Sequence, residues 1–118
     1  MSRQFKVVYA ANFPFAVFDG DDEAAWVLGA YLKEASSFLP DMLEAVEMAA
    51  TADIHPVQFA GNEILLDVFP DRAVIAAQWI KDQEDRECEV VIPLDEAKQL
   101  LTAWQAVLEE HRRLQRRT

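Results

Sequence analysis

The segment of residues 61–94 constrains the fold most, because its character changes several times along its length. Residues 63–69 alternate, with Ile64, Leu66 and Val68 on one side, and a period of two predicts a strand with one face more buried than the other. The Pro-Asp-Arg sequence that follows predicts a turn, because proline presets the first turn position and aspartate can bond its own backbone. The segment therefore opens with a strand and a turn.

Two further strands are predicted after that turn. Residues 73–80 are apolar except for Gln78, which favours a central strand covered on both faces. Residues 81–87 are wholly polar and predict a solvated loop. Residues 88–92 predict a short strand, which Pro93 ends because proline cannot donate to a ladder.

Shorter signals surround these strands. A brief strand over residues 57–60 and a Gly61-Asn62 turn complete a predicted antiparallel meander over residues 57–92. Nearer the N-terminus, residues 5–11 predict another strand, and residues 12–20, with a proline and an Asp-Gly pair, predict a loop.

Apolar spacing predicts three helices. The first covers about residues 22–38, Pro40 breaks it, and a second covers residues 41 to about 52. The third begins at Asp95 as its cap and is the clearest, with apolar residues in steps of three and four. These are Ala97, Leu100, Leu101, Trp104, Val107 and Leu108.

Together these elements predict a single α+β domain over residues 1–118. We expect an antiparallel sheet of about four to five strands. Two helices are inserted after the first strand, and a C-terminal helix packs on the sheet. Residues 111–118 are expected to form a basic, frayed tail.

Charge is the most informative part of the composition. The formal net charge is −10, and residues 1–110 hold all 21 acidic residues against seven Lys/Arg, which gives −14. The last eight residues add four arginines. An acidic body repels nucleic acid and anionic membranes and attracts a basic protein partner, although acidity can equally serve solubility alone.

Several features favour a cytoplasmic protein. No apolar run approaches the roughly 20 residues that a membrane helix needs. The N-terminus lacks the apolar core of a secretory signal. Cys88 is the only cysteine and cannot form an internal disulfide, which is typical of a reducing compartment.

The chain lacks the motifs that carry common enzyme chemistry. Phosphate-binding loops, dinucleotide-binding fingerprints and nucleophile elbows are absent, and three glycines cannot build a glycine-rich cradle. His55 and His111 have no zinc spacing, and residues 19–23 fail the calcium-loop pattern. We therefore expect no cofactor, no metal and no enzymatic activity, with an unassigned carboxylate pair as the open alternative.

Local acidic density defines the candidate partner-binding residues. One cluster lies in the polar loop, one on the second helix, and one before the first helix, where Asp21 or Asp22 also suits a cap. The residues are Asp82, Glu84, Asp85 and Glu87; Asp41, Glu44 and Glu47; and Asp21, Asp22 and Glu23.

Residues 61–108 resemble bacterial toxin-immunity proteins, including those of contact-dependent growth-inhibition and polymorphic-toxin systems. The resemblance lies in the Gly-Asn-Glu opening of a strand, the Asp71 turn, the polar loop, and Pro93-Leu94 leading into the C-terminal helix. It implies a non-catalytic cytosolic protein that neutralises one cognate toxin, usually a nuclease, and it implies no contact residue by position. Since a nuclease must hold a polyanion, the expected partner is basic.

A different class of function stays open. The chain could be a self-associating structural or regulatory interaction module, with Trp104, the C-terminal helix and the arginine tail supplying a homodimer face. Nucleic-acid binding by the tail is disfavoured, because the tail is short and attached to an acidic body.

Overall fold

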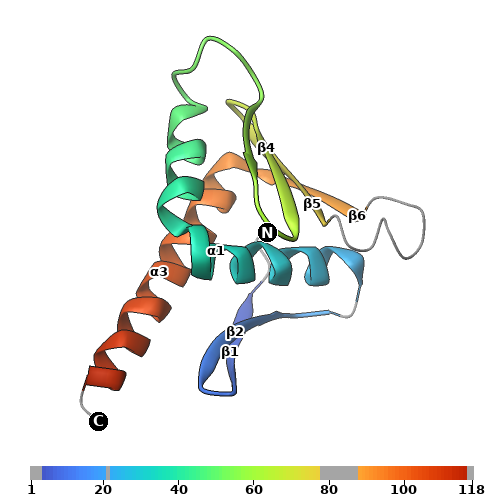
Figure 1. Cartoon of the computed structure of the whole chain (residues 1–118). Coiled ribbons are helices and arrows are strands. Elements are labelled where there is room, and N and C mark those ends of the chain that lie inside the picture. The colour runs from blue at the N-terminus through green and yellow to red at the C-terminus, as the bar shows by residue number, and fades with distance from the viewer. Residues whose placement is uncertain (1–3, 21, 78–87, 117–118) are drawn as a thin grey trace.

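The computed structural model describes residues 4–20, 22–77 and 88–116, which form two antiparallel sheets and two helices (Figure 1). This confirms the predicted α+β class. The elements follow in chain order: β1 (Phe5–Ala10), β2 (Phe13–Phe18), α1 (Glu23–Met48), β3 (Val57–Ala60), β4 (Ile64–Val68), β5 (Arg72–Ala77), β6 (Cys88–Pro93) and α3 (Leu94–Arg116).

The main sheet is the predicted meander, with the strand order β3-β4-β5-β6. The more buried face of β4 is the predicted one. Ile64, Leu66 and Val68 are fully buried, and the residues between them are half-buried. β5 is central, as predicted, but only one of its faces is fully buried. Its outward residues Val74 and Ala76 are half-buried, which corrects the prediction of two covered faces.

The N-terminal region differs from the prediction. Residues 13–18, expected to be a loop, form β2, which pairs with β1 in a separate two-stranded hairpin. Ala11 and Asn12 connect the strands with φ angles of 53° and 68°. Two positive φ angles in succession are those of a type I′ turn, whose twist matches a β-hairpin. The sequence does not predict this turn, because alanine is uncommon at the positive φ angles that a type I′ turn requires.

The two predicted N-terminal helices are joined into the kinked helix α1. Asp22 caps it, with its side chain accepting a hydrogen bond from the Ala25 backbone N–H at 3.2 Å. The kink lies at Phe38, which has non-helical φ and ψ angles, two residues before Pro40. Proline lacks an N–H and its ring crowds the preceding turn, so the break falls close to the predicted position.

The helices meet the inner face of the main sheet in one core (Figure 1). Trp104 is fully buried, and its Nε1 donates to Ser36 Oγ at 2.9 Å. Tyr31 is also fully buried, and its hydroxyl donates to the Ala97 carbonyl at 3.1 Å. These two hydrogen bonds tie α1 to α3 and satisfy polar atoms that the core would otherwise isolate.

α3 is longer than predicted at both ends. It begins at Leu94, one residue before the expected cap Asp95, and continues through Arg116. Residues 111–116, expected to belong to a basic tail, form the last turns of α3. The hairpin and this end of α3 project from the same side of the molecule (Figure 1).

Candidate functional site

The outward side of the main sheet forms a continuous surface, which we call the outer sheet face. Strand register places Gln58, Asp67, Val74 and Val91 in one row across all four strands. The next row holds Ala60, Leu65, Ala76 and Glu89. Because successive side chains of a strand point to opposite sides, these residues lie opposite the buried core positions.

The middle of the outer sheet face is apolar. Leu65, Val74 and Ala76 are half-buried by their neighbours, and Val91 on the edge strand is 54% exposed. The described helices pack on the other side of this sheet (Figure 1). An open apolar strip of this kind offers surface that a protein partner can bury.

Carboxylates flank that strip. Asp67 is half-buried, and its Oδ1 accepts a hydrogen bond from Gln58 Nε2 at 2.7 Å, which fixes its orientation. Glu89 is exposed two strands away. In the part of the chain that the structure describes, neither carboxylate has a cation within ion-pair distance.

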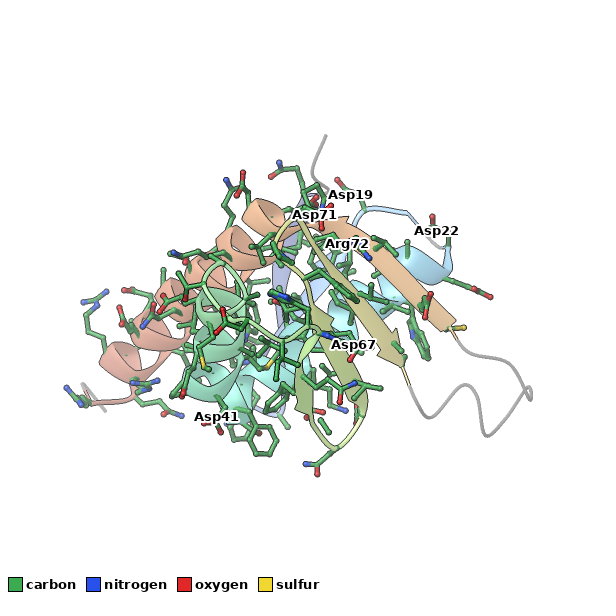
Figure 2. The ribbon with its side chains drawn as sticks, turned by 90° about the horizontal axis from the view of Figure 1, so that it is seen from above. Asp19, Asp22, Asp41, Asp67, Asp71 and Arg72 are labelled. Carbon is green, nitrogen blue, oxygen red and sulfur yellow. The ribbon has the colours of Figure 1, made fainter. Side chains whose placement is uncertain are left out.

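The turn between β4 and β5 closes one end of this face. Asp71 is ion-paired with Arg72 at 2.8 Å, and the Arg72 guanidinium lies 4.0 Å from the centre of the Phe69 ring. Figure 2 shows Asp71 and Arg72 at one end of the strands and Asp67 farther along. The Arg72 cation is therefore engaged by Asp71 and Phe69 of its own chain.

The structure separates the predicted acidic clusters. Asp41 and Glu44 are exposed on the second segment of α1, and Glu47 lies 4.0 Å from Lys98 of α3. Asp22 is on the far side of the molecule from Asp41 (Figure 2). Asp22 is engaged in capping, and Glu23 occupies the first helical turn. Asp21, Asp82, Glu84, Asp85 and Glu87 lie outside the described residues.

Sequence reasoning missed the combination of Asp67, Glu89 and Val91. Alternation correctly separated Asp67 from the buried side of β4, and a meander was predicted. Which residue of β6 lies opposite which residue of β5 depends on the exact strand ends, because a shift of one residue reverses both faces. The acidic residues of the sheet were therefore not recognised as one surface.

The described residues contain no group of three His, Cys, Asp or Glu side chains placed to hold a metal ion. Cys88 is fully buried at the start of β6. Within residues 4–20, 22–77 and 88–116, no helix is long and apolar enough to cross a membrane.

No protein-family model, curated protein or solved structure matches this chain.

Proposed function

We propose that this chain is a non-catalytic, cytoplasmic immunity protein that binds a basic toxin domain, of nuclease type, and covers its substrate-binding surface. The observation that carries the proposal is the outer sheet face, where an apolar strip lies between carboxylates that have no ion-pair partner among the described residues. The formal charge of −10 acts in the same direction.

The physical support has two parts. A nuclease needs a cationic surface to hold a polyanion, so an acidic inhibitor is drawn to that surface over long range. Carboxylates raise the association rate and set the orientation, but affinity needs desolvated apolar contacts near the centre of the interface. Leu65, Val74 and Val91 provide such contacts beside Asp67 and Glu89.

The decisive experiment is co-expression with the protein encoded next to this chain, preferably the C-terminal domain of a large neighbouring product. Growth rescue and co-purification are scored in the same cells. We expect a tight complex whose affinity falls with salt and which relieves toxicity. Absence of both complex and rescue, together with a stable dimer of the isolated chain, would instead favour a self-associating interaction module.

Matched charge reversals locate the interface. Asp67→Lys/Glu89→Lys should greatly weaken binding and flatten its salt dependence, because both changes place cations against a basic partner. Asp41→Lys/Glu44→Lys makes the same change in net charge on α1 and should leave the short-range contacts intact. If only the second variant loses binding, the interface lies on α1 and the outer sheet face is excluded. Thermal melts check that both variants fold.

The alternative, a self-associating module, was expected to use Trp104 in its dimer face. Trp104 is fully buried and hydrogen-bonded to Ser36, so it is not available for that contact. Self-association would have to use a surface without Trp104, such as the exposed last turns of α3 with their arginines, or another surface.

A further inference from the structure

The hairpin carries four of the nine large apolar side chains that are exposed in the described part of the chain. Residues 7–18 contain no charged residue, although 27% of the chain is charged. Four side chains of the hairpin are extensively exposed: Val8 (40%), Tyr9 (53%), Phe13 (61%) and Val17 (44%). A two-stranded ribbon is marginally stable by itself, and exposed apolar area of this kind marks an interaction surface.

The backbone of β1 presents an open edge. The Asp19 N–H donates to the Gln4 carbonyl at 3.1 Å, so these two residues form a hydrogen-bonded pair of the hairpin. Every second residue of an antiparallel strand bonds to the same neighbour. Lys6, Val8 and Ala10 therefore direct their backbone groups toward β2. Phe5, Val7 and Tyr9 direct theirs to the other side. Among the described residues, no backbone or side-chain group bonds to these three.

The second edge of the hairpin is protected. Pro14 lies opposite Tyr9 in β2, at a position whose missing N–H would point outward. Proline and cover by another element are the usual devices that keep an edge strand from pairing, and β2 also packs against α1. β1 has no proline, and Lys6 is its only charge. The hairpin is therefore open along β1.

We propose that β1 is the contact of a homodimer, in which it pairs antiparallel with β1 of a second copy, centred on Val7. This inference does not depend on the proposed function. Residues with outward backbone groups must meet one another, so Phe5 lies opposite Tyr9 of the second copy and Val7 lies opposite its own counterpart. The two hairpins then form one continuous four-stranded sheet.

Charge complementarity favours a second copy as the occupant. The tip of the hairpin lies beside the basic end of α3, since the rings of Tyr9 and Phe13 are 5.9 and 6.1 Å from the ring of His111. Arg112, Arg113 and Arg116 follow on those turns, and Arg113 is paired with Glu110 of the preceding turn. The base of the hairpin leads instead into Asp19, Asp22 and Glu23. Antiparallel pairing places the basic tip of each copy next to the acidic base of the other.

The first test is the mass of the full chain by sedimentation velocity across micromolar to millimolar concentrations. We expect a monomer–dimer equilibrium in this range. Val7→Pro should weaken the dimer by at least roughly tenfold, because it removes an intermolecular donor from each copy and none from the β1–β2 ladder. An unchanged melting temperature of the monomer shows that the hairpin is preserved.

A pair of side-chain variants checks the register without changing the backbone. Val8 lies opposite Lys6 of the second copy, so Val8→Glu should tighten the dimer about threefold and Val8→Lys should weaken it by a similar factor. Ile54→Glu is the matched control, because it adds the same charge at an exposed apolar residue outside the hairpin. A dimer that responds equally to Val8→Glu and Ile54→Glu would contradict this register.

Two results overturn the proposal. One is a chain that stays monomeric at every concentration, which would leave the edge for a strand of a different protein. The other is a dimer whose dissociation constant is unaffected by Val7→Pro.

Discussion

At the scale of single residues, Glu34 is a buried charged side chain, 5% exposed, on the sheet-facing side of α1. Its Oε1 accepts hydrogen bonds from the backbone N–H groups of Glu63 at 2.7 Å and Ile64 at 3.2 Å. The Gly61 N–H donates to the Ile64 carbonyl, which places the turn on Asn62 and Glu63, one residue later than predicted. Two donors compensate a carboxylate that burial would otherwise penalise.

The first prediction concerns Gly61, where an added Cβ would collide with the Glu34 carboxylate. Gly61→Ala should destabilise the fold by about 2 kcal/mol, because the carboxylate must leave its two donors or the turn must shift. Glu34→Ala should cost a similar amount by leaving a half-buried and a buried N–H group without a partner. Chemical denaturation measures both.

The double variant Gly61→Ala/Glu34→Ala provides the control. With the carboxylate absent, the added methyl has no partner to collide with, so the combined loss should be well below the sum of the single losses. Strict additivity would show that Gly61 is required for a different reason.

The second prediction concerns Tyr31, whose pKa is raised well above its ordinary value because burial disfavours the ionised phenolate. Above a pH of about 10 the unfolded chain loses this proton and the folded chain keeps it, so stability falls as pH rises. Below that pH the contribution is fully present. Urea unfolding of the wild type and of Tyr31→Phe at increasing alkaline pH measures the effect.

Tyr31→Phe should be less stable at neutral pH by about 1 kcal/mol, because the bond to the Ala97 carbonyl is lost. Its stability should fall less steeply in alkali than that of the wild type. Parallel curves for the two proteins would mean that other groups cause the alkaline loss.

At the scale of elements, the hairpin and the kinked helix illustrate how local rules are overridden. Ala11 adopts a φ of 53°, which costs an L-residue with a Cβ about 1 kcal/mol, yet the pairing of β1 with β2 and the packing of β2 on α1 hold it there. α1 continues past its break at Phe38, and the ring of that residue packs 5.7 Å from the ring of Phe59. Packing therefore holds the two segments of α1 together on either side of the kink.

The third prediction tests the turn. Ala11→Asn/Asn12→Gly supplies the residues that a type I′ turn prefers and should stabilise the protein by about 1 kcal/mol, measured as a higher midpoint of denaturation. Asn12→Val provides the opposite change, because a β-branched residue is strongly disfavoured at positive φ. If both variants had the same stability, the turn would not limit the hairpin.

At the scale of the whole molecule, acidic residues outnumber basic ones, 21 against 11. The exposed pairs Lys33–Glu63 and Arg72–Asp71, each 2.8 Å apart, neutralise two carboxylates. Exposed ion pairs stabilise a fold by at most about 1 kcal/mol each. A net charge of −10 on a body of 46 × 35 × 28 Å then leaves substantial repulsion within each molecule.

The fourth prediction follows from this repulsion. Added NaCl should raise the melting temperature by a few degrees, because a Debye length of about 8 Å at 0.15 M screens repulsion across the surface. Asp41→Asn/Glu44→Gln should be more stable at low salt and respond less to NaCl. A melting temperature that falls with salt would mean that ion pairs outweigh the repulsion.

Much of the architecture could be predicted, whereas the candidate site could be predicted only in part. The strand and turn signals of residues 57–93 are local, so the meander and the buried side of β4 followed from them. β2 was missed because Asn12, Pro14 and the Asp-Gly pair suggest a loop. Asp67 and Glu89 were missed as a pair because they are brought together by strand register rather than by proximity in the chain.

The sequence by itself determined the α+β class, the four strands of the meander, a helix cap at Asp21 or Asp22 and the acidic character of the body. These depend on hydrophobic period, turn residues and charge, which act over a few residues or over the whole chain. Only the tertiary structure decided that β1 leaves the main sheet with one edge open, that Glu34 holds a turn 29 residues away, and that Asp67 and Glu89 share a face. Each of these results from packing between segments that are far apart in the chain. Local sequence patterns do not specify which of these segments come into contact.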